Sequence, residues 1–231
     1  MQLQVPKNGM NNAKKEIVSK IQKISGKYSP DMVFADWICC SALAIQNSCY
    51  IIHDKVWNER EEQYKNIMNK YELEERREFA NMLKLLADAF EEEMSDILGE
   101  IYMESGCGSK LTGQFFTPFH VSYLTAEMAL ADQVITEEEK YEINEPSVGG
   151  GGMIIAAAMV LKNRGLNHQR CMKVVAQDLD WRSVYMAYVQ LSLLGIDAIV
   201  VQGDTLLNPY HKGVTPRSHI LMTPKRMGVL L

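Results

Sequence analysis

The sequence predicts an α/β protein in which a doubly wound parallel sheet follows an all-helical region. Three observations predict this fold class. Apolar residues recur at helical spacing over roughly the first 105 residues. Further along, short β-branched segments alternate with helical ones, as they do in parallel sheets. Four consecutive glycines, Gly149–Gly152, follow the first predicted strand and open the next helix. We therefore expect two parts, residues 1–105 and residues 106–231.

The front part is expected to be a set of helices joined by short turns. Isoleucines spaced three and four residues apart predict a first helix over residues 13–25. The apolar segment 31–53 is typical of a buried helix, and the charged segment 54–71 is typical of a helix at the surface. Segment 72–103 carries one long apolar stripe at helical spacing, which predicts a further helix.

The back part is expected to alternate strands and helices after a flexible joint at Gly106–Ser109. A helix is predicted after Pro118, over residues 120–131. We expect a sheet of about four parallel strands, each short and rich in β-branched or apolar residues. The predicted strands are 142–145, 172–177, 198–202 and 219–222, and the predicted intervening helices are 152–163 and 181–195.

The composition limits the classes of protein that the chain can be. Hydrophobic residues make up 47% and charged residues 23%, which is typical of a globular protein. We find no apolar run long enough to span a membrane and no secretory signal pattern, so we expect a cytoplasmic protein. The five cysteines lack CxxC spacing, and the histidines lack metal-ligand spacing. Neither a disulfide framework nor a metal site is therefore expected.

The net charge of -5 is divided unevenly along the chain. Residues 146–231 contain nine Lys or Arg and four Asp or Glu, which gives +5. The other 145 residues contain fifteen Lys or Arg and twenty-five Asp or Glu, which gives -10. Because phosphate neutralisation supplies most non-specific affinity for nucleic acids, the acidic front does not suit a nucleic-acid surface. Any such contact is expected from the back part or from a partner subunit.

Acidic side chains stand at the ends of three consecutive predicted strands, at Glu145, Asp178 and Asp204. The carboxyl ends of parallel strands meet at one edge of a sheet, where ligands bind. A glycine turn lets the backbone approach a ligand, and the following helix offers free N–H groups. We interpret Asp178 as a ribose ligand and Asp204 as a partner of an adenine amino group. The structural alternatives are a plain turn, a helix cap at Asp180 and a turn at Asp204.

A further motif lies upstream of the glycine turn. A helical segment with the pattern Leu-Gly-x-Ile-Tyr precedes Gln-Phe-Phe-Thr-Pro. With these motifs in this order, the chain resembles adenine-N6 DNA methyltransferases, and most closely the modification subunits of type I restriction systems. The resemblance covers about residues 95–231, and the helical front resembles the N-terminal domain of those subunits more loosely. The residues that carry it are 96–102, 113–118, 145–152, Asp178 and 203–206.

The resemblance implies a Rossmann-like methyltransferase fold, truncated here, with S-adenosylmethionine as the cofactor. It implies DNA as the substrate, with the target base flipped out of the stack before direct methyl transfer to its exocyclic nitrogen. The Phe-Thr-Pro segment would fold over the methionine end of the cofactor. Carried over residue by residue, the cofactor-binding positions are Phe115, Phe116, Thr117, Pro118, Glu145, Pro146, Gly149, Gly151, Asp178 and Asp204.

The catalytic half of the family pattern is not matched. In the family, the fourth strand ends in Asn/Asp-Pro-Pro-Tyr/Phe, which holds the target base. Distance from the third strand predicts this place at Thr223, Pro224, Lys225 and Arg226, where the Asn, the second Pro and the aromatic ring are missing. A less favoured alternative, Asn208-Pro209-Tyr210, has matching residues but directly follows the third strand. The catalytic residues stay open.

Two functions from different classes remain. The first is an adenine-N6 DNA methyltransferase of the restriction-modification type. The second is a catalytically inactive or truncated methyltransferase-fold protein that acts as a cofactor-binding or interaction module. Later strands and target recognition would come from a missing C-terminal segment or a specificity subunit, so activity of this chain alone is open. The helical front is a candidate surface for homo- or hetero-oligomerisation.

Overall fold

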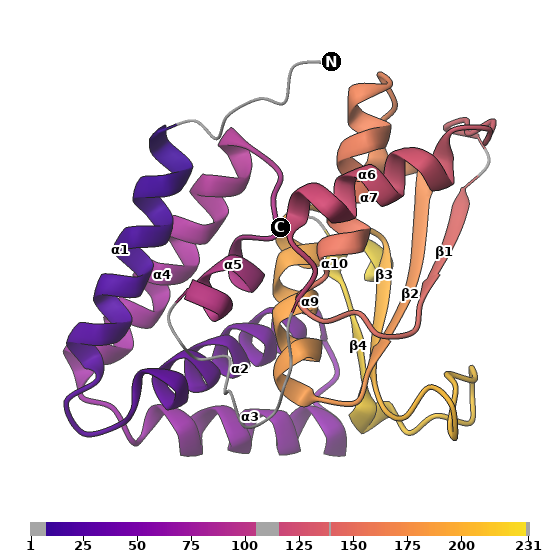
Figure 1. Ribbon diagram of the computed structural model, residues 1–231. Coiled ribbons are helices and arrows are strands. Elements are labelled where there is room, and N and C mark those ends of the chain that lie inside the picture. The colour runs from indigo at the N-terminus through magenta and orange to yellow at the C-terminus, as the bar shows by residue number, and fades with distance from the viewer. Residues whose placement is uncertain (1–7, 105–115, 139, 230–231) are drawn as a thin grey trace.

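The computed structural model describes residues 8–104, 116–138 and 140–229. Two parts lie side by side, with the front helices on one side and the sheet on the other (Figure 1). The expected division at residue 105 falls in segment 105–115, outside the described residues. Buried hydrophobic side chains from both parts form one continuous core. In the described residues, no helix has the length and apolar character that crossing a membrane requires.

The front part consists of helices, as predicted, and two of them begin at strong N-terminal caps. The Ser29 side chain accepts a hydrogen bond from the Met32 N–H at 3.3 Å, and Pro30 occupies the first helical position. The Asp54 carboxylate accepts a hydrogen bond from the Trp57 N–H at 3.0 Å. The helices are α1 (Asn8–Ile24), α2 (Pro30–Ser48), α3 (Lys55–Met68), α4 (Leu73–Glu92) and α5 (Ile97–Glu104).

The stripe predicted as one helix over residues 72–103 is two helices, α4 and α5. The chain leaves the helical conformation at Glu93, which is extended with φ -157°. It starts again after Asp96, whose side chain accepts a hydrogen bond from the Gly99 N–H at 2.9 Å. Because both helices bury apolar residues on the same core, the periodicity continues across the break and conceals it from the sequence.

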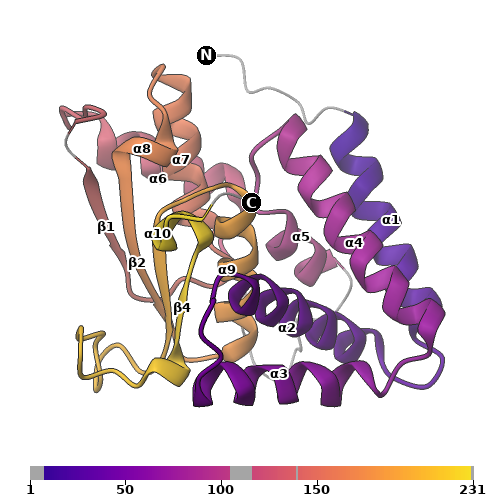
Figure 2. The same ribbon diagram turned by 180° about the vertical axis from the view of Figure 1, so that it is seen from behind.

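The back part alternates strands and helices as predicted, with two additional short helices, α8 and α10. Helix α6 packs on α7, and α9 packs on β2, β3 and the front helix α2 (Figure 2). The elements are α6 (Phe119–Leu130), β1 (Tyr141–Glu145), α7 (Gly152–Asn163), α8 (His168–Cys171), β2 (Met172–Asp178), α9 (Trp181–Leu193), β3 (Ala198–Gln202), a 3-10 turn (Arg217–His219), β4 (Ile220–Met222) and α10 (Pro224–Met227).

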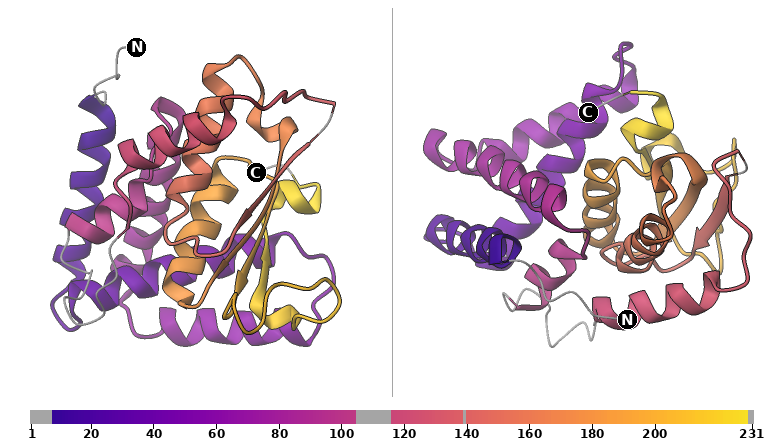
Figure 3. Two further views of the ribbon diagram at one scale, coloured as in Figure 1. Left: turned by 45° about the vertical axis from the view of Figure 1, so that its right-hand side comes forward. Right: turned by 90° about the horizontal axis from the view of Figure 1, so that it is seen from above.

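The sheet has the order β1-β2-β3-β4, and its first three strands are parallel. Helices α7 and α9 connect them and lie on the face of the sheet that turns toward the front helices (Figure 3). Buried residues of β2 and β3, such as Val174, Ala176 and Val200, belong to the common core. This arrangement brings the carboxyl ends of β1, β2 and β3 to one edge, as the sequence predicted.

The prediction of a fourth parallel strand is wrong, because β4 runs antiparallel to β3. Val200 pairs with Leu221, and Val201 pairs with Ile220. A parallel return needs a crossover, usually a helix, that carries the chain back along the sheet. The connection over residues 203–219 contains only turns and one short 3-10 turn, so the chain reverses beside β3 instead.

Side chains of the front helices cover the outer edge of β4. The Met222 N–H donates to Gln46 Oε1 at 2.8 Å, and Arg60 donates to the Ile220 carbonyl at 2.8 Å. Both Gln46 and Arg60 are buried. The exposed backbone groups of an edge strand are thereby satisfied, and the helical front is held against the sheet.

Candidate cofactor site

The loops after β1, β2 and β3 are tied together at the carboxyl edge of the sheet. The Val148 N–H donates to the Gln177 carbonyl at 2.9 Å, which joins the first loop to the end of β2. The Thr205 hydroxyl donates to the Pro146 carbonyl at 2.7 Å, which joins the loop after β3 to the loop after β1. These bonds bring the three acidic positions that the sequence singled out to one edge of the molecule.

Two of the four glycines are required by the backbone conformation of the loop. Gly149 has φ +53° and Gly151 has φ +102°, both in the left-handed region that side chains disfavour. A Cβ at Gly149 would also lie 2.9 Å from the ring of Phe116. The Phe116 ring therefore packs directly on the loop.

The other two glycines are required by a buried carboxylate. A Cβ at Gly150 would lie 2.9 Å from Asp96 Oδ1, and a Cβ at Gly152 would lie 2.9 Å from Asp96 Oδ2. Asp96 is 4% exposed, so its side chain cannot swing into solvent to make room. The loop and the residue before α5 thus fit against each other.

Asp96 is part of a buried polar network that reaches the loop through α9. Gln190 on α9 donates to Asp96 Oδ1 and to the Gly150 carbonyl, each at 2.7 Å. The Leu98 N–H donates to the Gln190 side-chain oxygen at 3.0 Å. Burial raises the pKa of Asp96, while the hydrogen bonds from Gln190 and Gly99 act in the opposite direction. Sequence reasoning missed this role, because Asp96 lies within the stripe 72–103 that predicts one continuous helix.

A cavity of about 370 Å³ lies between α6 and the glycine loop. The N-terminus of α7 opens into it, and its lining is largely polar. The lining residues are Asp96, Phe116, Thr117, Ser122, Ser147, Val148, Gly149, Gly150, Gly152, Met153 and Asp178.

Ser122 is the second lining residue that sequence reasoning missed. It lies on α6 and is 0% exposed, and its hydroxyl has no hydrogen-bond partner within the described part of the chain. A buried hydroxyl left without a partner costs about 1–3 kcal/mol. A ligand that accepts a hydrogen bond would remove this cost. No sequence signal distinguishes this serine from an ordinary helical one.

Asp178, the predicted ribose ligand, and Glu145, the acidic residue before the glycine loop, lie close to each other. Asp178 Oδ2 accepts from the Gly149 N–H at 2.9 Å, and its Oδ1 accepts from the Asp180 N–H at 3.0 Å. Burial raises the pKa of Glu145, and the nearby Asp178 charge raises it further, while a hydrogen bond from Ser147 lowers it. Asp180 caps α9 as expected, accepting from the Arg182 N–H at 3.3 Å.

The remaining predicted cofactor positions have mixed surroundings. Thr117 lines the cavity, whereas Phe115 lies outside the described residues. Pro118 starts α6, and its carbonyl accepts from the Ser122 N–H at 3.1 Å. Pro146 is not among the residues that line the cavity, and its carbonyl accepts from the Thr205 hydroxyl.

Asp204 lies at the same edge but faces a neighbouring cavity of about 600 Å³. Its Oδ1 accepts from the N–H groups of Leu206 and Leu207 at 2.9 and 3.1 Å, which is the turn that the structural alternative described. Asn208 and Pro209 line this second cavity too. The side-chain amide of Gln177 holds the segment by donating to the Asn208 carbonyl and accepting from the Tyr210 N–H, each at 3.0 Å.

The segment Thr223–Arg226, which distance from the third strand singled out as the place of the family's motif, does not lie at the carboxyl edge of the sheet. The Thr223 N–H donates to the Ala198 carbonyl at 3.0 Å, and the Thr223 hydroxyl donates to the Ile196 carbonyl at 2.7 Å. Ala198 begins β3, so the segment with Pro224 and Lys225 lies at the opposite edge of the sheet. Arg226 pairs there with Asp197 at 3.3 Å. The antiparallel direction of β4 is the physical reason.

The comparisons with known proteins agree with the family named above. The profile of the family described as N-6 DNA Methylase matches residues 91–226. No curated protein sequence matches the chain.

Solved structures of similar fold are longer than this chain. A protein from Listeria monocytogenes described as a class I S-adenosylmethionine-dependent methyltransferase is 12% identical, with a TM-score of 0.46 over 89% of this chain and 57% of that one. A type I restriction-modification methyltransferase subunit from Streptococcus thermophilus is also 12% identical, with a TM-score of 0.48 over 89% of this chain and 60% of that one. The chain thus spans less than two thirds of the length of either protein.

Proposed function

This chain belongs to the N-6 DNA methylase family, and on that premise we propose that it binds S-adenosylmethionine for the methylation of adenine N6 in DNA. One observation carries the proposal. The glycine loop, Asp96, Asp178 and the N-terminus of α7 enclose a polar cavity at the carboxyl edge of the sheet. The substrate that family membership implies is DNA. The partners that it implies are the other subunits of a type I system.

The residues around the cavity fit the two charged groups of the methionine end. The α-carboxylate fits the free N–H groups at the start of α7 together with the unpartnered Ser122 hydroxyl. The α-ammonium fits the acidic side chains that line the cavity, Asp96 and Asp178. A site that offers both an anion subsite and a cation subsite suits a zwitterionic amino acid group.

Asp178 retains the capacity to hold the ribose. Each of its oxygens accepts one backbone hydrogen bond, from Gly149 and from Asp180. A carboxylate oxygen has two lone pairs, so each can accept a further bond from a ribose hydroxyl. The backbone bonds hold the carboxylate in place before the ligand arrives.

When bound, S-adenosylmethionine supplies an electrophilic methyl group. The chain itself contributes binding and orientation: Phe116 and Thr117 cover the loop side of the cavity, and the acids fix the ligand along the sheet edge. Holding the donor in one orientation supplies a large part of the rate of a transfer reaction. The acceptor-binding groups are not assigned by this proposal.

A second candidate function is a cofactor-binding module that does not transfer the methyl group. One observation favours it. In the family, an Asn/Asp-Pro-Pro-Tyr/Phe motif holds the target base, and sequence distance places it here at Thr223–Arg226. This segment is bonded to the start of β3 and not to the carboxyl edge of the sheet. Tritiated methyl transfer to unmethylated DNA distinguishes the two functions. Incorporation above that of a protein-free control supports the first, and binding without incorporation supports the second.

The cofactor proposal is tested by calorimetric titration with S-adenosylmethionine. Replacing Asp178 with Ala is expected to weaken binding roughly tenfold or more, because hydrogen bonds to a charged group are lost. Asp180→Ala is the matched control, since its carboxylate caps α9 and is expected to leave the affinity nearly unchanged. No binding by the unaltered chain would overturn the cofactor proposal, and equal affinity in Asp178→Ala would overturn the ribose assignment.

A further inference from the structure

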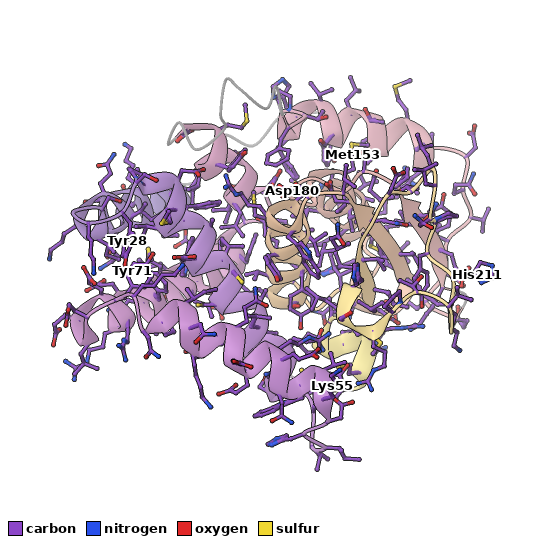
Figure 4. All side chains as sticks on the ribbon, turned by 90° about the horizontal axis from the view of Figure 1, so that it is seen from below. Tyr28, Lys55, Tyr71, Met153, Asp180 and His211 are labelled. Carbon is purple, nitrogen blue, oxygen red and sulfur yellow. The ribbon has the colours of Figure 1, made fainter. Side chains whose placement is uncertain are left out.

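A long groove lies between the front helix α3 and the start of α9. It consists of two cavities, of about 700 Å³ and about 360 Å³, which share Glu59, Gln63, Trp181 and Tyr185 as lining residues. We call it the α3–α9 groove. Figure 4 views this side of the molecule from below, with Asp180 labelled at the start of α9 and Lys55 at the start of α3.

The groove has the length of a short extended peptide. One face of α3 forms a wall from Glu59 to Ile67, with Gln63 and Asn66 between them. At a rise of 1.5 Å per residue this wall is about 12 Å long. An extended chain advances about 3.3 Å per residue, so about four residues would fill it. The side-chain amides of Gln63 and Asn66 can bond the backbone of such a segment.

The exposed charges that are left unpaired in the groove are acidic. Glu62 on α3 and Asp180 at the N-terminal cap of α9 line it from opposite walls, and neither forms a salt bridge with any residue that the structure describes. Among the described residues, Glu59 forms a salt bridge with Lys55 alone, one turn away on the same exposed helix face at 3.7 Å. An exposed pair of this kind contributes little, so the Glu59 charge remains available.

The basic groups of the groove are already engaged. Lys70 pairs with Asp36 at 3.1 Å, and Arg182 pairs with Asp31 at 2.6 Å. Arg60 lines only the smaller cavity and forms no salt bridge with a described residue, so it keeps its charge; it is buried, and its guanidinium donates to backbone carbonyls beside β4. A ligand entering the larger cavity therefore meets carboxylates on two walls and no unpaired cation among its lining residues.

Aromatic and aliphatic side chains complete the lining. The rings of Trp181 and Tyr185 stack with their centroids 5.1 Å apart and an interplanar angle of 26°. The smaller cavity adds Leu43, Val56 and Leu221. A guanidinium group stacks well on aromatic rings, and its methylene groups pack on aliphatic ones. This combination recognises arginine better than it recognises a bare amine.

We propose that the α3–α9 groove docks an extended, arginine-bearing segment of a partner protein. The negative charge of the exposed groove residues excludes a DNA strand, because the DNA phosphates would face Glu59, Glu62 and Asp180. The site differs from the proposed cofactor cavity, with which it shares no lining residue. The inference therefore goes beyond the proposed function and stands independently of it.

The test measures fluorescence anisotropy of a short labelled peptide in which arginine alternates with leucine, titrated with the full chain. Saturable binding is expected. The double variant Glu59→Gln/Glu62→Gln is expected to weaken it roughly tenfold, the effect of losing two partly desolvated charge pairs. The matched control is Glu91→Gln/Glu92→Gln, which changes the net charge equally on exposed positions of α4 and should leave affinity within a factor of two, roughly.

Three outcomes would overturn the proposal. Equal weakening by both double variants would mean that the peptide follows net charge alone. Equal binding of a peptide with glutamate in place of arginine would remove the charge argument. Absence of binding, with self-association lost in Glu59→Gln/Glu62→Gln, would assign the groove to a second copy of the chain. All four substituted residues are exposed, so melting temperatures should match that of the unaltered chain.

Discussion

Replacing Ser122 with Ala is expected to weaken ligand binding without lowering the stability of the fold. Its hydroxyl is buried in the cavity and has no partner among the described residues. Ser122→Ala removes an unsatisfied polar group, so the free energy of unfolding should stay equal or rise by about 1 kcal/mol. The affinity for S-adenosylmethionine should nevertheless fall roughly fivefold, because a hydrogen bond to the ligand carboxylate is lost.

Calorimetry and urea denaturation on the same preparation measure both quantities for Ser122→Ala. Thr125→Ala is a suitable control, since Thr125 lies on the exposed side of the same helix and its hydroxyl donates within the helix at 2.9 Å. Loss of stability in Ser122→Ala without a change in affinity would show that the hydroxyl serves the fold instead of the ligand.

Asp96 provides a prediction of pH dependence. Burial raises its pKa in the folded chain, so the unfolded chain ionises first as the pH rises. The free energy of unfolding should therefore fall with rising pH between the unfolded pKa, about 3.9, and the higher folded pKa. Asp96→Asn should lack this decline, because its amide oxygen still accepts from Gly99 and Gln190 without ionising.

Urea denaturation of both proteins at a series of pH values above 4 checks the sign. The difference in unfolding free energy between Asp96→Asn and the unaltered chain should grow with pH and then level off. A constant difference over the whole range would mean that the carboxyl ionises equally in both states.

At the scale of single residues, the sequence predicted which residues gather at the carboxyl edge of the sheet but not which residues support them. Gly149, Gly151, Asp178 and Asp204 follow from strand ends and turn chemistry, which are local. Asp96 contacts the glycine loop although more than 50 residues separate them in the sequence. Gln190, which bonds both Asp96 and the Gly150 carbonyl, lies 40 residues beyond Gly150. Contacts between distant segments leave no periodic signal.

Among the strands, β4 is the one whose direction the sequence did not predict. Its composition predicts a strand, and a strand is present over Ile220–Met222. Its direction depends on the connection after β3 and on Gln46 and Arg60, which bond its outer edge from the front helices. Hydrophobic pattern fixes where a strand occurs, whereas pairing partners fix its direction, and these lie far away in the sequence.

The contribution of Gln46 to holding the outer edge of β4 can be tested by substitution. Gln46→Ala should lower the free energy of unfolding by about 1–3 kcal/mol, because the buried Met222 N–H loses its acceptor. Gln22→Ala, at an exposed position of α1, is expected to change it by less than about 0.5 kcal/mol. Chemical denaturation measures both. Equal effects of the two substitutions would mean that β4 is held without the glutamine.

On the scale of the whole molecule, the two parts depend on each other. The glycine loop rests on Asp96, the edge of β4 rests on α2 and α3, and one buried core spans both parts. A chain beginning at residue 106 would expose that core and lose all three supports. We expect such a fragment to lack cooperative thermal unfolding and to lose cofactor binding, whereas the full chain melts in one transition. A cooperatively melting fragment would show that residues 106–231 fold alone.

The covering of β4 has a consequence for assembly. The sheet has two borders, and one of them is closed by Gln46 and Arg60. At the other border, Tyr141–Glu145, no described residue forms a backbone hydrogen bond to the outward side of the strand. Among the described residues, this border alone is open to a further strand, which would lie beside β1 and its last residue, Glu145, at the carboxyl edge of the sheet.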